Sequence, residues 1–352
     1  MKRTGLTLLA AVTAGLIFTN ASAQTGGNST FEFLNLPSSA RMAALGGNFL
    51  AIADDDLTLA YTNPSLINPS MHKGLALSFV DYFSDVNYGY ASYAHSFSNT
   101  GTFAGTLHFI DYGRFISADP TGAQQGYFNA SELAFNIGWG RNLDSNFTIG
   151  ANIKGIYSSF ETYTSTGLAV DIAASYINPE NRFTLTLLVR NAGIQLTRYS
   201  PGDREPLPFE IAIGLSKRLE HVPLRFSVLA TQLQKWDLTY DDPFLTETDP
   251  VTGEPKKQSG LSGIADKVMR HIVLGAEFQP FKALSFRVGY NYQKRQQMKV
   301  ESKMSTVGFS WGIGLRISKF QFNYARANDH LDRKSTRLNS SPGKSPRMPS
   351  SA

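Results

Sequence analysis

The feature that most constrains this chain is an alternation of apolar and polar residues that recurs in segments of about ten residues. In residues 132–141 the apolar positions are Leu133, Phe135, Ile137 and Trp139. Residues 146–158 repeat the alternation after the short turn "NLDSN". Successive side chains of a β-strand point to opposite faces of its sheet. Each segment is therefore predicted to be a strand with one apolar and one polar face, and the two pair as a hairpin.

Extending this pattern along the chain predicts thirteen strands joined by connections of two kinds. Those after odd strands are long and include residues 112–130, residues 193–208 and the segment from Lys235 to Val268. Those after even strands are short, such as "SNTG", "NPEN" and "FKA". The strands are expected at about 75–84, 86–97, 102–111, 131–142, 146–158, 166–177, 182–192, 208–219, 223–234, 269–280, 284–294, 304–317 and 319–326.

Both the faces and the loops favour an all-β transmembrane antiparallel barrel. Outer-membrane barrels alternate apolar-out and polar-in, with short periplasmic turns and long outer loops. The polar faces carry residues that a lumen tolerates and hydrocarbon does not: Arg190, Glu210, Arg218, Glu277, Arg287, Asn291 and Arg316. A soluble β-sandwich also alternates, but it does not require long and short loops in strict succession.

The odd number of predicted strands indicates that one further strand is needed. A barrel that begins on the periplasmic side closes with an even number of strands, because an open edge in lipid leaves backbone groups unpaired. We therefore expect about fourteen strands in the barrel, residues 71–327, with the last one missing from this chain or replaced in it. Residues 328–352 are Ser-, Pro- and Arg-rich with few apolar residues, so we expect a disordered or artefactual tail there.

The first 23 residues read as a cleaved secretory signal. Lys2 and Arg3 precede an apolar run that ends at the small residues Ala21-Ser22-Ala23. The chain has no cysteine, so neither a lipidated cysteine nor a disulfide framework is available. Its formal net charge is +5, but the excess of positive charge lies in the predicted signal segment and in the C-terminal tail. The remainder is close to neutral, which argues against a nucleic-acid partner.

Residues 24–70 precede the first strand and combine Gly, Asp and Pro with short apolar runs. Irregular backbone at membrane depth is tolerated only where protein buries it. We therefore predict that residues from about 41 to 68 fold back into the lumen as a plug.

The stretch "ARMAALGGNFLAIADDDLTLAYTNPSLIN" resembles the plug of the FadL-type outer-membrane barrels. That superfamily shares an Ala-Arg stretch, a Gly-Gly, an Ala-Asp-Asp and an Asn-Pro-Ala element. In this chain they correspond to Ala40-Arg41, Gly46-Gly47, Ala53-Asp54-Asp55 and Asn63-Pro64-Ser65. Ser65 departs from the usual Ala by a small-for-small change.

Within that superfamily the chain is most similar to the PorV-like barrels of the type IX secretion system. The resemblance covers roughly residues 25–327 and rests on "STFEFLNLPSSARMAALGG", "DKVMRHIVLGAEFQP", "RVGYNYQKRQQ" and "ISKFQFNYARA". It implies an outer-membrane protein without catalytic activity. Its extracellular loops would hold a PorZ-like surface protein beside the PorU–PorV pair, in contact with outer-membrane lipid or lipopolysaccharide. The alternative is a FadL-type transporter of hydrophobic molecules, which the largely polar inward positions disfavour.

The candidate plug residues are Arg41, Gly46, Gly47, Asp54, Asp55, Asn63 and Pro64. A buried arginine requires carboxylate or carbonyl partners, so Arg41 is expected to anchor the plug, with a substrate contact as the other possibility. The two glycines and the Asn-Pro pair are expected to form turns. Asp54, Asp55 and Asp56 are interpreted as cap or turn residues, because they lack the alternating ligand spacing of calcium loops.

A candidate partner-facing loop contains Lys256, Lys257, Leu261 and Ile264. Together with Ala265 and Val268, the last two form an apolar stripe typical of a short helix. Such a stripe either folds over the barrel mouth or presents a docking surface, and the sequence leaves both open.

No enzyme, metal or cofactor is expected. The six histidines show no short metal spacing such as HExxH. His95 and Ser96 are adjacent, which on a strand sends them to opposite faces rather than together as a nucleophile and its base.

Overall fold

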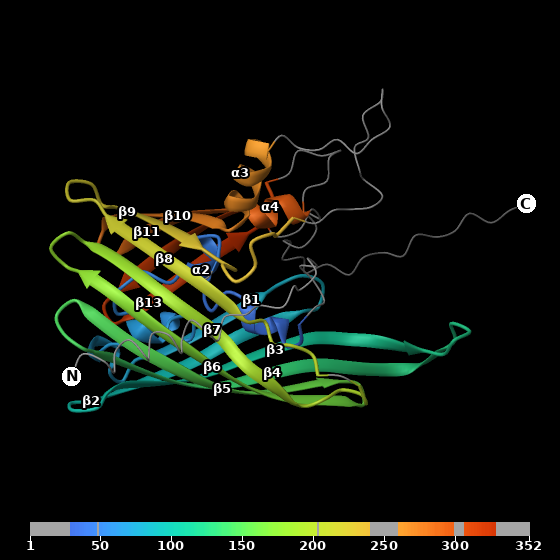
Figure 1. Ribbon diagram of the computed structural model, residues 1–352. Helices are drawn as coiled ribbons and strands as arrows, with labels where there is room; N and C mark the ends of the chain where they lie inside the picture. Colours follow the sequence, from blue (N-terminus) through green and yellow to red (C-terminus); the bar gives the residue numbers. More distant parts are fainter. Residues whose placement is uncertain (1–28, 48, 203, 240–259, 299–305, 329–352) are drawn as a thin grey trace, which may run out of the picture.

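The computed structural model describes residues 29–47, 49–202, 204–239, 260–298 and 306–328. The predicted signal segment, the tail from residue 329 and the two lysines Lys256 and Lys257 lie outside the described residues. The described chain forms one antiparallel sheet (Figure 1). Its 13 strands are β1 (Leu75–Asp81), β2 (Asn87–Phe97), β3 (Gly101–Ala118), β4 (Gln124–Asn142), β5 (Phe147–Phe160), β6 (Tyr163–Asn178), β7 (Phe183–Thr197), β8 (Glu210–Arg218), β9 (Leu224–Ala230), β10 (Ile272–Phe281), β11 (Leu284–Asn291), β12 (Phe309–Ile317) and β13 (Phe320–Ala327).

Each strand pairs with its neighbours in sequence, from β1 to β13. The predicted number of strands and their antiparallel order are confirmed. Among the described residues no ladder joins β13 to β1, and an odd number of antiparallel strands leaves these two edges running in the same direction. The sheet is consistent with a β-barrel.

The two faces of the sheet have the polarity opposite to that of a soluble protein. On the outer face large apolar side chains are exposed, including Leu107, Phe135, Ile153, Leu187, Val228, Val288, Phe309 and Trp311. Trp139 lies on the same face, half-buried, and its Nε1 donates to Thr100 O at 2.8 Å. On the inner face polar side chains are buried, including Thr106, Glu132, Asn136, Asn152, Lys154, Asp171, Glu277 and Arg287. The predicted alternation therefore holds, with the apolar face outward.

Of the residues predicted to face inward, Arg190 and Arg218 are half-buried and Arg316 is exposed. The Arg316 side chain is 44 % exposed, because it is the second-last residue of β12, where the sheet ends.

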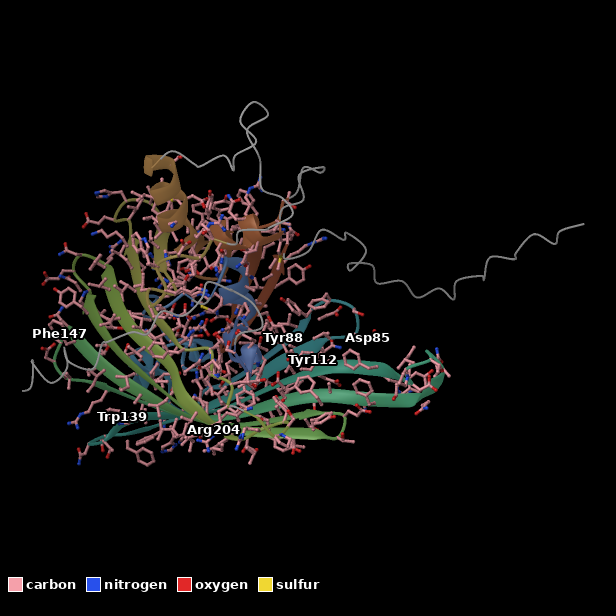
Figure 2. All side chains as sticks on the ribbon, turned by 45° about the vertical axis from the view of Figure 1, so that its right-hand side comes forward. Asp85, Tyr88, Tyr112, Trp139, Phe147 and Arg204 are labelled. Carbon is pink, nitrogen blue, oxygen red and sulfur yellow. The ribbon has the colours of Figure 1, made fainter. Side chains whose placement is uncertain are left out.

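The connections after the even strands lie at one end of the sheet and are all short. Those after the odd strands lie at the other end; they are long after β7, β9 and β11, but β5 and β6 are joined by residues 161–162 alone, so the predicted strict alternation of long and short loops is wrong. We call these the turn end and the loop end. Phe147 marks the turn end and Asp85 the loop end in Figure 2. Two short helices lie within the long connections at the loop end: α3 (Gly260–Arg270) precedes β10, and α4 (Tyr292–Met298) follows β11 directly. The helix predicted from the apolar stripe is therefore confirmed as α3.

Residues 112–130 were expected to form a loop, and that expectation is wrong. β3 continues to Ala118 and β4 begins at Gln124, so the two strands extend past their neighbours as a long hairpin (Figure 1). Aromatic pairing stabilises it: Phe115 stacks on Phe128, and the Arg114 guanidinium lies 5.0 Å from the Tyr127 ring centroid. At the tip, Asp119 Oδ1 accepts from the backbone N–H groups of residues 121 and 123, which is the geometry of a tight turn.

Residues 31–71, the inner segment, lie against the inner face of the sheet. The segment contains η1 (Glu32–Asn35), α2 (Ala40–Ala44), η2 (Leu57–Leu59), η3 (Pro64–Leu66) and η4 (Pro69–Met71). These pieces are short because Asn and Asp caps and three prolines interrupt them. In the part of the chain that the structure describes, no helix is long and apolar enough to cross a membrane.

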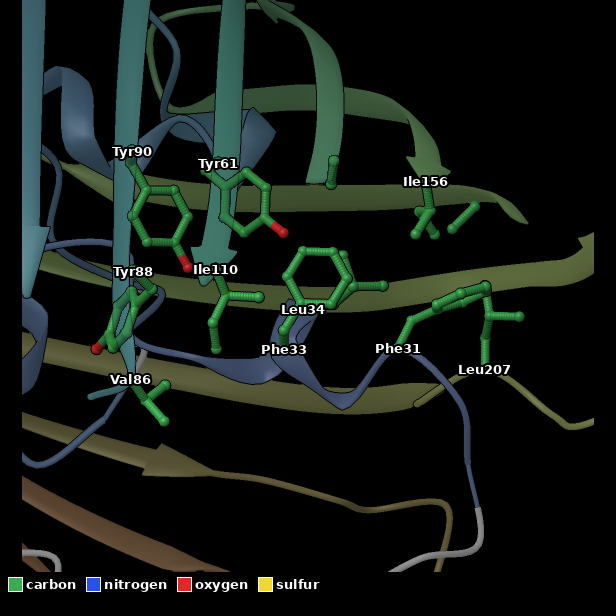
Figure 3. Close-up of a cluster of buried hydrophobic side chains, with 12 residues drawn as sticks. Phe31, Phe33, Leu34, Tyr61, Val86, Tyr88, Tyr90, Ile110, Ile156 and Leu207 are labelled. Atoms are coloured by element: carbon green, nitrogen blue, oxygen red, sulfur yellow. The ribbon is translucent and has the colours of Figure 1, made fainter. Parts of the chain in front are cut away.

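The apolar core is formed between the inner segment and the sheet rather than between two sheets. Figure 3 shows one cluster, in which Phe33 and Leu34 of the inner segment lie between Tyr88 and Tyr90 of β2 on one side and Phe31 and Leu207 on the other. A second cluster joins Met42, Leu45, Phe49, Leu50 and Leu59 to side chains of β6, β7, β8, β9 and β10. The sheet thus curves around the inner segment.

Candidate functional site: the inner segment and the loop helix

Arg41 lies at the centre of a buried charge network. The residue is 4 % exposed, and its guanidinium reaches Asp54 Oδ2 at 2.8 Å, Asp56 Oδ2 at 3.1 Å and Glu277 Oε2 at 3.1 Å. Asp54 and Asp56 belong to the inner segment, whereas Glu277 belongs to β10. Arg41 therefore ties α2 both to its own segment and to the wall of the sheet.

Two further arginines complete the network. Arg287 Nε of β11 lies 2.7 Å from Glu277 Oε2, and Arg225 Nη1 of β9 lies 3.3 Å from Glu277 Oε1. Three arginines thus face the carboxylates of Asp54, Asp56 and Glu277, so the formal charges balance. Removal of one partner of a buried pair leaves the other charges uncompensated, which costs more than the pair itself contributes.

The three consecutive aspartates have three different roles. Asp54 joins the network and also accepts the backbone N–H of Asp56 at 3.2 Å. Asp56 caps η2 by accepting from the N–H of Thr58 at 3.1 Å. Asp55 is half-exposed and pairs with Arg316 of β12 at 2.8 Å. The hydrogen bond from Arg316 lowers the pKa of Asp55 below its ordinary value. The predicted cap and turn geometry is present, together with ion pairs that the sequence did not indicate.

Gly46 turns the chain after α2 with φ +95°, a conformation that L side chains rarely adopt. Its carbonyl accepts from Asn291 Nδ2 at 3.2 Å. A Cβ built on Gly289 of β11 would lie 2.0 Å from the carbonyl carbon of Leu45. Gly47 does not need this conformational freedom, and its N–H donates to Met42 O. The backbone of the turn can therefore touch the backbone of β11 only because Gly46 lies in the turn and Gly289 lies opposite it in the strand.

The Asn63-Pro64 turn is fixed in the same way against another part of the wall. Asn63 Oδ1 accepts from the N–H of Ser65 at 3.0 Å, and Asn63 Nδ2 donates to Leu50 O at 2.6 Å. Ser65 Oγ lies 2.6 Å from Ser175 Oγ of β6, a contact that an alanine at position 65 would lack. A Cβ on Gly150 of β5 would lie 2.3 Å from Pro64 C.

A second buried ion pair was missed by the sequence interpretation. Lys154 Nζ of β5 lies 2.7 Å from Asp171 Oδ2 of β6 and 2.9 Å from Asn191 Oδ1 of β7. Its Nζ also lies 4.8 Å from the ring centroid of Tyr61, which belongs to the inner segment. Both charged residues occupy inward positions of adjacent predicted strands, and this coincidence was the signal available in the sequence.

Helix α3 is attached at the loop end by polar contacts. Lys267 Nζ lies 2.6 Å from Asp237 Oδ2, and Tyr292 OH of α4 donates to Asp266 Oδ1 at 2.7 Å. On the predicted stripe Ile264 is 55 % and Val268 40 % exposed. The side chain of Leu261 lies outside the described residues. The stripe residues whose side chains are described are therefore open to solvent.

Comparisons with models of known protein families and with curated proteins gave no match for this chain. Within the described residues no group of three or more His, Asp or Glu side chains is arranged to hold a metal ion. What the geometry offers is a fixed segment packed on the inner face of the sheet, with exposed apolar side chains at the loop end.

The close fit between turn and wall predicts a difference between two glycines of the same strand. In Gly150→Ala the new methyl group meets the backbone at Pro64, so we expect a loss of about 1–3 kcal/mol in the free energy of unfolding. Gly155, also on β5, has nothing within 4 Å of a built Cβ, so Gly155→Ala should cause no such loss. Urea unfolding monitored by tryptophan fluorescence compares the two, and equal effects would contradict the fit described.

The Arg41 network predicts a similar contrast between arginines. Arg41→Ala leaves buried carboxylates unpaired and should destabilise the fold by about 3–5 kcal/mol. Arg316→Ala removes a half-exposed pair and should cost no more than about 1 kcal/mol. Urea unfolding again measures both losses. A smaller loss in the free energy of unfolding for Arg41→Ala than for Arg316→Ala would refute the anchoring role.

The attachment of α3 should depend on pH. Burial opposes the shift, but hydrogen bonds from Lys267 and Thr239 lower the pKa of Asp237 to about 2. Because this value lies below the ordinary one, the stabilisation is present above about pH 4 and is lost as the pH falls toward 2. Hydrogen exchange of the α3 amides, corrected for intrinsic rates, should show this loss. Asp237→Asn should give lower protection at pH 7 without the acid transition; the same acid transition in this variant would exclude the pair as its cause.

Proposed function

We propose that this chain is an outer-membrane β-barrel protein similar to PorQ, the PorV-like barrel of the type IX secretion system. In this proposal it anchors a PorZ-like surface protein through its extracellular loops and works beside the PorU–PorV pair. The single observation that supports it most is the inverted polarity of a sheet whose interior is filled by a fixed segment of the same chain.

The outer face supports a membrane location. Burial of an apolar side chain away from water contributes about 1.5–3 kcal/mol, and many large apolar side chains of this face are exposed in the isolated chain. Hydrocarbon removes that surface from water. The buried ion pairs and amides of the inner face need partners that lipid does not provide.

The loop end supports an anchoring role. Helix α3 is held by Asp237 and α4, yet it exposes Ile264 and Val268. The long β3–β4 hairpin exposes Ile116 and Tyr127 beyond the neighbouring strands. Exposed apolar and aromatic side chains on supported elements are typical of protein-binding surfaces.

A FadL-type transporter of hydrophobic molecules has less support. Such a protein needs an apolar passage, whereas the inner wall carries buried charged and amide side chains, and its apolar side chains are covered by the inner segment. The inner segment occupies the space within the wall and is fixed there by Arg41 and by the Asn63-Pro64 turn.

The chain lacks cysteine, so single-cysteine variants test the membrane location cleanly. Ile153 lies on the outer face and is 57 % exposed, and Ile116 lies on the hairpin and is 53 % exposed. In intact membranes Ile153→Cys should react with a lipid-soluble maleimide and resist a water-soluble one. Ile116→Cys should react with both, and rapid labelling of Ile153→Cys by the water-soluble reagent would rule out lipid contact.

The anchoring role is tested by purifying the protein from outer membranes and identifying what accompanies it. A PorZ-like surface protein is expected, and Ile264→Asp with Val268→Asp should reduce its recovery at least about tenfold, which corresponds to a loss of about 1.4 kcal/mol. Tyr163→Asp is the matched control, because Tyr163 is 51 % exposed at the same end, at the start of β6, outside both α3 and the hairpin. Absence of any PorZ-like protein from the wild-type complex, or equal recovery with all variants, would refute this role.

A further inference from the structure

The turn end carries an excess of positive charge. Seven cations lie in or beside its short turns: Lys73, Arg141, Arg182, Lys217, Arg218, Lys282 and Lys319. We call them the turn rim. The carboxylates at the same level are fewer, namely Asp144, Glu180 and Glu220, since Asp55 is paired with Arg316.

The rim cations are positioned but not neutralised. Arg182 Nη1 donates to Leu219 O at 3.2 Å, and Lys217 Nζ donates to Asn181 O at 2.6 Å. Arg218 Nη2 donates to Gln279 Oε1 at 3.4 Å. Among the residues that the structure describes, no rim cation forms an ion pair with a carboxylate. Five of them are exposed, namely Lys73, Arg141, Arg182, Lys282 and Lys319, whereas Lys217 and Arg218 are half-buried.

Large apolar side chains stand beside these cations on the outer face. They are Leu75, Leu143, Val222, Phe281 and Phe320, exposed by 70 %, 61 %, 46 %, 70 % and 68 %. Phe147 belongs to the same level, at the turn end of β5 (Figure 2). Each of several turns thus offers a cation and, next to it, an apolar group. This combination suits the boundary between headgroups and acyl chains, where long cationic side chains reach toward the polar layer.

The loop end is different. There Lys267 is paired with Asp237, and Arg270 Nε lies 2.7 Å from Asp266 Oδ2. Other loop-end cations such as Arg198 and Arg204 are exposed, but carboxylates accompany them there, namely Asp81, Asp85, Asp111, Asp119, Glu161 and Glu205. The excess of positive charge therefore belongs to the turn end.

We propose that the turn rim binds the phosphate groups of anionic phospholipids in the membrane leaflet that it faces. This inference rests on the proposed membrane location. The rim follows successive turns along the sheet with an apolar residue beside the cation, which fits a ring of lipids. An acidic protein partner would instead fit a compact patch, and the short turns provide little surface for one. Attraction of this kind weakens as salt screens it.

The experiment uses the full chain reconstituted in vesicles of phosphatidylcholine alone or mixed with phosphatidylglycerol. Native mass spectrometry of the extracted protein then measures which lipid is retained. The wild type should retain phosphatidylglycerol preferentially, and Lys282→Gln with Lys319→Gln should reduce this preference by about fivefold for each cation removed. The matched control, Arg198→Gln with Arg204→Gln, removes two exposed cations from the loop end and should leave the preference unchanged.

The outcomes separate the inference from the function on which it rests. Insertion into both vesicles without any preference for phosphatidylglycerol overturns the inference and leaves the membrane location intact. Failure to insert into either vesicle contradicts the membrane location, and the inference falls with it. Abolition of the preference by millimolar inorganic phosphate would show a free-anion site and overturn the lipid assignment. The same applies if the rim variant keeps its lipid preference but loses a co-purifying acidic protein.

Discussion

The buried polar wall of the sheet is the constraint on which the rest of the structure depends. Side chains such as Lys154, Glu277 and Arg287 are removed from water and need charged or hydrogen-bonding partners. The inner segment provides several of them: Arg41 reaches Glu277, and Tyr61 lies under Lys154. Wall and segment therefore stabilise each other, and large apolar side chains cover the outer face.

The contacts also explain why the inner segment is irregular. A regular helix or strand would meet the wall along one line, whereas short turns at Gly46 and Asn63-Pro64 bring backbone against glycines of β11 and β5. The small wall residues permit this approach at several places around the curve. A fixed interior leaves the loop end, with α3 and the β3–β4 hairpin, free to contact a partner, while the turn rim faces the opposite surface.

Strand positions and the orientation of their faces could be predicted from the sequence because a period of two is a local property. That Arg41 needs carboxylates was also predictable, but one of its partners, Glu277, lies 236 residues away, and no local pattern reveals such a pairing. The Lys154–Asp171 pair was missed for a different reason: both residues occupy inward positions of adjacent predicted strands, and their proximity was not considered. The hairpin of β3 and β4 was mistaken for a loop because Gly and Pro at 113, 120, 122 and 126 outweighed the aromatic alternation around Phe115 and Phe128.

The central claim is that the inner segment seals a polar lumen inside a membrane-inserted sheet. Deleting residues 41–65 and recording single-channel currents in planar bilayers tests it most directly. The full chain should insert without measurable conductance, and the deleted chain should insert and conduct ions through the polar interior. Equal conductance of the two inserted proteins would contradict the account.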